Sequence, residues 1–360
     1  MKLTFHIGAG KTGSSAVQRA LAVAKHDLAD QGILVAPANL EVGGNVGGQQ
    51  VFAFQTIKQL EFSQSRQTFA ARMQALIVDA GSRGGQHLIF SAENLSNPHP
   101  WSEVIGDSLA GHDVEVVVYI RRQDNYLLSA WQQWTLKRGI PFDSWLVEVV
   151  GIDGDWRIPI EEWEKVATGG RLTVRLYEPE HLVGGDVAQD FFSVCDLPTA
   201  PLGEPTVVNR SYGMAAEELA MASGNLFSDP HDSGFFDFLD RYCHGAHLRQ
   251  ANESRLTVAE RQAILGRYRD SNNWIRERYF SGPEHKHIPP TLFTPPRAGD
   301  GRPPANDDLQ RGQLAIVTEL LYGLYRERLD SGADPHPVRM DDQQSTSEQN
   351  NGDRPGSDRR

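Results

Sequence analysis

One segment of the chain, VEVVVYI at residues 114–120, constrains the fold more than any other. Apolar and mostly β-branched residues dominate it, which is typical of a strand buried on both faces within a parallel sheet. Shorter apolar runs occur at residues 3–8, 33–37, 87–93 and 171–178. Because segments with helical spacing separate these runs, we predict an α/β fold with a doubly wound, mostly parallel sheet flanked by helices.

Helices are predicted where apolar residues recur every three or four positions. This spacing is found at residues 14–31, where Gly32 ends the pattern, and again at residues 66–80 and 125–138. A glycine-rich segment at residues 41–50 interrupts the alternation and predicts a flexible loop. In such sheets ligands bind beyond the carboxyl ends of the strands, so we expect a functional site in the loops that follow them.

The second half of the chain becomes mostly helical from about residue 212. The segments 256–280 and 309–329 have the spacing of long amphipathic helices. Few of residues 331–360 are apolar, so we expect a disordered tail there. The predicted organisation is an α/β domain at 1–285, a loop rich in proline and glycine at 286–306, a C-terminal helix packed on the domain at 307–330, and the tail at 331–360.

Net charge and cysteine content exclude several classes of protein. The 360 residues carry a net charge of −12, so an anion site has to be local, and we expect no binding of nucleic acid. Two cysteines, Cys195 and Cys243, are too few for a disulfide scaffold and fit a reducing compartment. No apolar run has the length of a signal peptide or a membrane span, so we expect a cytoplasmic protein.

The segment HIGAGKTGSS, residues 6–15, joins the first predicted strand to the first predicted helix. A helix N-terminus presents free N–H groups and the positive end of a dipole, and it therefore binds phosphate or sulfate. Glycines let the backbone approach an anion closely, while a lysine adds charge and hydroxyls add donors. The residues with these properties are Gly8, Gly10, Gly13, Lys11, Thr12, Ser14 and Ser15. The simpler alternative is that Thr12 or Ser14 caps the helix and that Lys11 is solvated.

The same segment ends like a nucleoside-triphosphate P-loop but does not begin like one. Gly10, Lys11 and Thr12 match the last three positions of that motif, whereas Phe5 stands where its first glycine belongs. A shortened loop suits one terminal phosphoryl or sulfuryl group. The central strand is followed by Arg121 and not by the acidic residue that a Mg²⁺–nucleotide site needs, which argues against such a site.

A second anion site is predicted after the central strand, in YIRRQDNYLLSAW at residues 119–131. The guanidinium of Arg121 offers a planar fork of donors to a phosphate, and the hydroxyl of Ser129, on the next helix, offers another. The alternative is that Arg121 pairs with a carboxylate such as Asp124. Two anion sites at the ends of two strands require a ligand with two separated anionic groups.

These two segments together resemble a known family. HIGAGKTGSSAVQRAL resembles the 5′-phosphosulfate loop, and VVVYIRRQDNYLLSAW the 3′-phosphate motif, of sulfotransferases that use PAPS, 3′-phosphoadenosine 5′-phosphosulfate. The segments VRLYEPEHL at 174–182, NRSYG at 209–213 and RYRDSNNWIRERYF at 267–280 resemble later parts of the same fold, as in bacterial, carbohydrate-type members. The resemblance covers about residues 3–280 and implies a sulfotransferase fold related to P-loop NTPases, with a helical C-terminal half. The family loop usually has proline where this chain has Gly10.

The resemblance also implies an activity and roles for single residues. The implied reaction moves a sulfuryl group from PAPS to a hydroxyl, or an amine, of an acceptor, and no metal is expected. Arg121 and Ser129 would hold the 3′-phosphate, and Tyr177 would lie near the adenine. The residues implied to hold the 5′-phosphosulfate are Gly10, Lys11, Thr12, Gly13, Ser14 and Ser15.

Sulfuryl transfer needs a group that stabilises the leaving oxygen and a base that takes the acceptor proton. Lys11 suits the leaving oxygen. Glu93, in FSAENLS just after the third strand, is our candidate base because it faces the same sheet edge as the loop. The alternative is a Glu93 that caps a helix or forms a salt bridge. His6 and His99 are competing bases, although a lone histidine inside a strand, such as His6, is more often structural.

Two histidine-containing segments remain, and neither predicts a metal site. CHGAH at 243–247 offers Cys243, His244 and His247, but no second pair completes a zinc set. EHKH at 284–287 is a weaker candidate still.

The expected function is in-line sulfuryl transfer with a carboxylate base. The acceptor is expected to be a small molecule or a glycan, and the resemblance around Glu93 favours a carbohydrate. Two alternatives stay open: a small-molecule kinase with a degenerate P-loop, and an inactive nucleotide-binding scaffold of the same fold.

Overall fold

A single parallel sheet forms the centre of the computed structural model, which describes residues 1–46, 49–198, 212–245, 248–249 and 253–331. Its strand order is β2-β3-β1-β4-β5, and every neighbouring pair is parallel. The strands are β1 (Lys2–His6), β2 (Ile33–Val35), β3 (His87–Ser91), β4 (Asp113–Ile120) and β5 (Leu172–Leu176). All five coincide with the predicted apolar runs, so the α/β class and the parallel sheet are confirmed.

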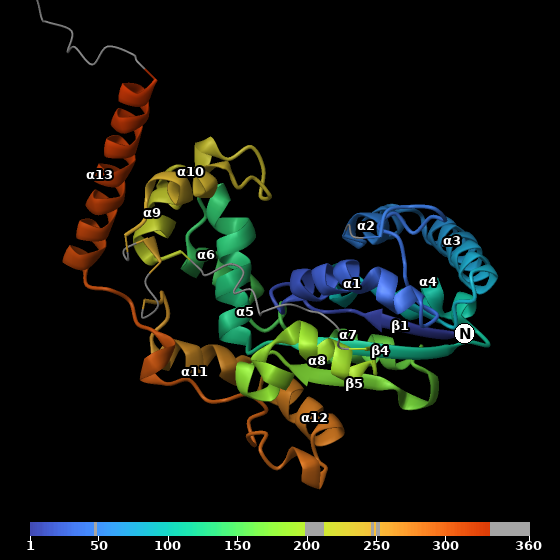
Figure 1. Cartoon of the computed structure of the whole chain (residues 1–360). Helices are drawn as coiled ribbons and strands as arrows, with labels where there is room; N and C mark the ends of the chain where they lie inside the picture. The colour runs from blue at the N-terminus through green and yellow to red at the C-terminus, as the bar shows by residue number, and fades with distance from the viewer. Residues whose placement is uncertain (47–48, 199–211, 246–247, 250–252, 332–360) are drawn as a thin grey trace, which may run out of the picture.

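Helices connect the strands and cover both faces of the sheet (Figure 1). The first eight are α1 (Ser14–Ala29), α2 (Val51–Gln59), α3 (Phe62–Ser82), α4 (Trp101–Ile105), α5 (Gln123–Ala130), α6 (Phe142–Val149), α7 (Arg157–Glu164) and α8 (Val187–Val194). The remaining ones are α9 (Met214–Ala222), α10 (Gly234–Tyr242), α11 (Val258–Arg267), α12 (Arg269–Tyr279) and α13 (Asn306–Asp330). The helices expected at 14–31, 66–80 and 309–329 are confirmed. Several short helices, such as α2 and α7, were not predicted, because eight or nine residues contain too few periodic positions.

Two predicted helices are interrupted in the structure. The helix expected at 125–138 continues from α5 into a π-helical turn (Trp131–Thr135) and then a 3-10 turn (Leu136–Arg138). The helix expected at 256–280 divides into α11 and α12 at Tyr268, whose buried hydroxyl donates to the Asp153 carbonyl at 2.5 Å. In the described part of residues 212–331 the regular structure is helical, with one isolated bridge between Glu253 and Arg302.

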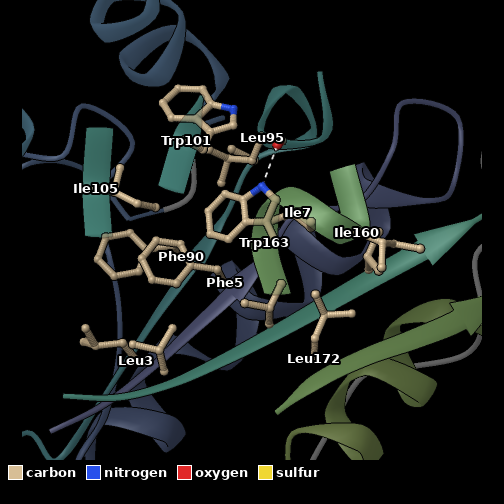
Figure 2. Packing of buried hydrophobic residues seen from close by; sticks show 14 of the residues in the cluster. Leu3, Phe5, Ile7, Phe90, Leu95, Trp101, Ile105, Ile160, Trp163 and Leu172 are labelled. Atoms are coloured by element: carbon tan, nitrogen blue, oxygen red, sulfur yellow. Dashed lines mark hydrogen bonds between the residues drawn. The ribbon is translucent and has the colours of Figure 1, made fainter. Parts of the chain in front are cut away.

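Alternate strand residues point to opposite faces of the sheet, and each face has its own apolar layer. On one face Phe5 stacks on Phe90, with ring centroids 4.7 Å apart. The indole of Trp163, from α7, packs against Phe5 and donates to the Leu95 carbonyl at 2.9 Å (Figure 2). On the other face α1 and α8 pack against Tyr119 and its neighbours.

The path of the chain determines which edge of the sheet is open to a ligand. Helix α1, which follows β1, covers one face, whereas α4 and α7, which follow β3 and β4, cover the other. The connections therefore diverge at the carboxyl ends of β1, β3 and β4, where sheets of this kind bind ligands. The loop after β1, Glu93 after β3 and Arg121 after β4 all lie at this edge.

The C-terminal helix α13 contacts α9 and α10, and it lies at the opposite end of the molecule from α3 (Figure 1). The expected disordered tail falls outside the described residues, apart from Ser331. Residues 47–48 of the glycine-rich loop and 209–211 of the NRSYG segment fall outside them as well. None of the described helices has the length and apolar character needed to cross a lipid bilayer.

Candidate functional site

The loop between β1 and α1 is held by its own hydrogen bonds. Thr12 is fully buried, and its hydroxyl donates to the Ala9 carbonyl at 2.6 Å. Lys11 and Gly13 have left-handed backbone angles, with φ of 66° and 80°. A Cβ at position 13 would also lie 2.7 Å from Val187, so this turn requires glycine. The Thr12 hydroxyl thus stabilises the loop, which differs from the expectation that it donates to an anion.

No side chain caps the N-terminus of α1. The N-cap residue is Gly13, and no side-chain hydrogen bond closes the first turn. Ser14 instead donates its hydroxyl to Glu93 Oε2 at 2.8 Å, and Ser15 is exposed. The alternative in which Thr12 or Ser14 caps the helix is therefore wrong, and the first N–H groups of the helix remain available to a ligand.

Because Gly10 has no side chain, there is space for an aromatic ring that packs on the loop. A Cβ built on Gly10 would stand 3.2 Å from Cη2 of Trp134, which is closer than two carbon atoms normally approach. Trp134 belongs to the π-helical turn that follows α5. Gly10 stands where the family that the loop resembles usually has proline, and it leaves room for this indole.

Arg121 reaches from the end of β4 to the same loop. Its Nη1 donates to the Lys11 carbonyl at 2.9 Å, and its guanidinium lies 5.8 Å from the ring centre of Tyr177. Asp124 pairs with Arg122, at 2.8 Å, so the alternative in which Arg121 pairs with Asp124 is wrong. Within the described residues Arg121 forms no ion pair, and its charge is left for a ligand.

A third cation, Lys137, belongs to the same group, although the sequence did not single it out. Its side chain is nearly buried, and Nζ donates to the Pro230 carbonyl at 2.9 Å. Lys137 follows the π-helical turn, which rotates side chains away from the positions they have in a regular α-helix. A basic residue at a helix end usually indicates only a solvated side chain, so no sequence signal marked it.

The charges of these residues are not balanced. Burial lowers the pKa of the Lys11 ammonium, and the positive charges of Arg121 and Lys137 lower it further, while Glu93 acts in the opposite direction. Burial also lowers the pKa of Arg121 and that of Lys137, while the carboxylates of Asp232, Asp229 and Asp237 act to raise that of Lys137. None of the three cations forms an ion pair among the described residues, so a bound anion would add negative charge beside Lys11 and Arg121. We refer to Lys11, Arg121, Lys137 and Glu93 as the Lys11 site.

His6 lies beneath the loop and is fully buried. Its Nδ1 is 2.8 Å from Ser91 Oγ, and burial lowers its pKa to about 3. A Cβ on Gly8 would stand 2.6 Å from His6 Nε2, so the ring fills the space under the backbone. These contacts support a structural role for His6.

Among the described residues, two other predicted residues form no hydrogen bond or ion pair with the Lys11 site. Ser129, on α5, is half-buried, and no hydrogen bond joins it to Arg121. His99 lies 4.4 Å from Trp101, ring to ring, in a surface pocket of about 460 Å³. That pocket is lined by Leu95, Asn97, Pro98, His99, Pro100, Trp101, Ile158, Pro159, Glu162 and Trp163, and it includes no residue of the Lys11 site.

The segment CHGAH contributes to packing in the part that the structure describes. Cys243 is buried, and its Sγ faces the Ile316 carbonyl of α13 at 3.7 Å. The His244 backbone donates to Glu319 at 3.0 Å. His247 falls outside the described residues.

Comparison of the chain with protein-family models, with curated proteins and with solved structures finds no match. The chemistry of the Lys11 site is therefore inferred from its own residues and from the two motifs in the sequence.

Proposed function

We propose that this chain is a PAPS-dependent sulfotransferase with the P-loop-related fold of that family. The observation that carries the proposal is the pair Lys11 and Arg121, which form no ion pair among the described residues, with Lys137 nearby, beside the uncapped N-terminus of α1. Such a group favours a ligand with more than one anionic centre. The resemblance of the two strand-end segments to the PAPS motifs supplies the class of ligand.

In this proposal each residue acts on a different part of PAPS. Lys11 and the first turn of α1 hold the 5′-phosphosulfate, and Arg121 holds the 3′-phosphate together with Ser129. The bond between sulfur and the 5′-phosphate oxygen breaks while a bond forms between sulfur and the acceptor oxygen. Adenosine 3′,5′-bisphosphate leaves, and Lys11 stabilises the charge on its oxygen.

Glu93 takes the acceptor proton in this mechanism. Because Ser14 donates to Glu93 at 2.8 Å, the carboxylate lies next to the helix turn that would hold the sulfuryl group. A base has to be within hydrogen-bond reach of the acceptor hydroxyl as that hydroxyl attacks. The acceptor therefore approaches from the side of β3, and Trp134, packed on the loop, offers a flat apolar surface on which a sugar ring can stack.

One observation favours a second candidate, a small-molecule kinase. A loop hydroxyl and a carboxylate are the protein groups that hold Mg²⁺ in P-loop nucleotide sites. Ser14 and Glu93 stand in that relation, although the carboxylate follows β3 and not the central strand where we expected an acid. A kinase would bind ATP with Mg²⁺, whereas a sulfotransferase binds adenosine 3′,5′-bisphosphate without it.

Thermal unfolding in the presence of each nucleotide separates the candidates. We expect adenosine 3′,5′-bisphosphate alone to raise the Tm by a few degrees, because a ligand that binds only the folded state stabilises it. A rise with Mg²⁺–ATP alone would instead identify the kinase, and a rise in Tm without any turnover would identify the inactive nucleotide-binding scaffold. No rise with either nucleotide would contradict the proposal. Labelled PAPS, tested with sugars, phenols and amines, then identifies the acceptor.

A further inference from the structure

Three metal-ligating side chains meet at the carboxyl end of β5, outside the Lys11 site. They are Glu178, Glu180 and His181, and their candidate ligand atoms all lie within 4.8 Å of one another. The backbone that carries them is fixed, since Arg175 Nη2 donates to the His181 carbonyl at 2.8 Å and the His181 N–H donates to the Glu178 carbonyl at 2.9 Å. The cluster is therefore a preorganised arrangement, not a group of free surface side chains.

The imidazole of His181 lacks the partners that a buried imidazole normally has. Its side chain is only 8% exposed, and neither ring nitrogen has a hydrogen-bond partner. Nε2 lies 3.5 Å from Glu178 Oε2, which is too long for a hydrogen bond. A buried polar side chain without a partner indicates that a ligand is missing from the cluster.

The two carboxylates also lack a balancing charge. Glu178 is nearly buried, and the exposed Glu180 lies close to it. Thr294 donates to both: its hydroxyl lies 3.2 Å from Glu178 and 3.1 Å from Glu180, and its N–H lies 3.4 Å from Glu178. Arg122 contributes only a partial attraction to Glu178, because its guanidinium is paired with Asp124 and Asp300.

A second imidazole stands beside the cluster. The ring of His287, from the EHKH segment, lies 5.4 Å from the ring of His181, centroid to centroid. His287 is exposed, so its side chain can turn toward the carboxylates without disturbing the core. Two imidazoles and two carboxylates are a donor set that Zn²⁺ binds in tetrahedral geometry.

We propose that Glu178, Glu180 and His181 bind a Zn²⁺ ion, with His287 as the fourth ligand. The ion would join the end of β5 to the segment that contains His287 and Thr294, and it would have a structural role. From the sequence we expected no metal, since the resemblance implies none and EHKH was a weak candidate. The EHKH segment is also about a hundred residues from Glu178 in the chain. The proposal does not depend on the proposed transferase activity.

Zinc titration of the full chain tests the proposal. After treatment with a chelator, we expect the protein to take up about one Zn²⁺ per chain, measured by elemental analysis, with a rise of a few degrees in Tm. Co²⁺ in place of Zn²⁺ should give the visible absorption of a tetrahedral site. If the chelated protein takes up no Zn²⁺ and its Tm does not change, the proposal is wrong.

Substitution of the exposed ligands tests which residues bind the Zn²⁺ ion. Glu180→Gln and His287→Asn remove ligands at the surface, so folding should be retained while Zn²⁺ affinity falls at least about tenfold. His181→Asn should abolish uptake, but the exposed variants decide the result if this one does not fold. His244→Asn, in the other histidine-containing segment, is the matched control and should leave affinity unchanged. The proposal fails if His244→Asn lowers affinity while Glu180→Gln and His287→Asn do not.

Discussion

Two regions rich in positive charge contain adjacent residues, Arg121 and Arg122, and they differ in whether a carboxylate pairs with the arginine. Arg122 is buried and pairs with Asp124 at 2.8 Å and with Asp300 at 2.5 Å. Arg261, also buried, pairs with Asp124 as well. We refer to Arg122, Asp124, Arg261 and Asp300 as the Asp124 network. Arg121, by contrast, donates to a backbone carbonyl and lies in the Lys11 site, where the cations have no paired carboxylate.

The difference shows how a charged side chain can be assigned to folding or to binding. Within the Asp124 network each charge has a partner in the folded chain, so its loss should reduce stability. In the Lys11 site no cation forms an ion pair among the described residues, so the loss of Lys11 or Arg121 should mainly reduce binding. The predictions below test this division, from the largest expected effect to the smallest.

The largest effect is expected when the candidate base of the Lys11 site is neutralised. Glu93→Gln keeps an acceptor for the Ser14 hydroxyl but cannot take a proton, so kcat should fall by about 10²–10⁴-fold. Binding of adenosine 3′,5′-bisphosphate, measured by calorimetry, should stay as it is. Full turnover in this variant would show that Glu93 is not the base.

Removal of the central carboxylate of the Asp124 network should mainly reduce stability. Asp124→Asn leaves Arg122 and Arg261 buried without their shared partner, and the free energy of unfolding should fall by about 3–5 kcal/mol. Urea denaturation measures the change. The control is Asp107→Asn, which removes an exposed partner of Arg66 and should cost less than about 1 kcal/mol. Equal losses in the two variants would contradict the division between the regions.

Arg121→Ala should mainly reduce ligand affinity and have a smaller effect on stability. Hydrogen bonds from a charged donor contribute about 1.5–3 kcal/mol, so the affinity for adenosine 3′,5′-bisphosphate should fall by about 10–100-fold. The Tm of the free protein should fall less than in Asp124→Asn, because Arg121 loses one hydrogen bond, to the Lys11 carbonyl, and its contact with the Tyr177 ring, but no ion pair among the described residues. Lys137→Met keeps the apolar stem and should weaken binding as well, though less. A variant that loses stability and keeps its affinity would place Arg121 among the structural residues.

The smallest effect is expected from pH. The pKa of Lys11 is lowered from its ordinary value of 10.5, so Lys11 loses its proton at a lower pH than an exposed lysine does. Since the charged form binds the anion, affinity for adenosine 3′,5′-bisphosphate should fall by less than about tenfold as pH rises through this lowered pKa. Lys11→Arg should move the fall to higher pH, because a guanidinium keeps its proton. Identical pH profiles for the two proteins would show that Lys11 does not bind the nucleotide.

Most of the sheet could be predicted from the sequence. Apolar runs such as 114–120 indicate a strand that is buried on both faces. Such a run can be read from neighbouring residues alone, so no knowledge of the tertiary structure is needed. One glycine of the first loop, Gly13, has the left-handed angle that glycine adopts easily, whereas the left-handed angle of Lys11 had no sequence signal. The helix at 125–138 was predicted without its π-helical turn, which results from packing and has no periodic signal.

The sequence by itself determined the five strands, the helices at 14–31, 66–80 and 309–329, the loop with its lysine, and the pair of arginines after the central strand. These follow from local spacing and backbone preference. Only the tertiary structure decided that Arg122 joins Asp300, 178 residues away, while Arg121 stays without a carboxylate. It also turned the Thr12 hydroxyl inward and brought Lys137 to Lys11. The physical reason is that charge compensation depends on distances between segments remote in the chain, and no local pattern encodes those distances.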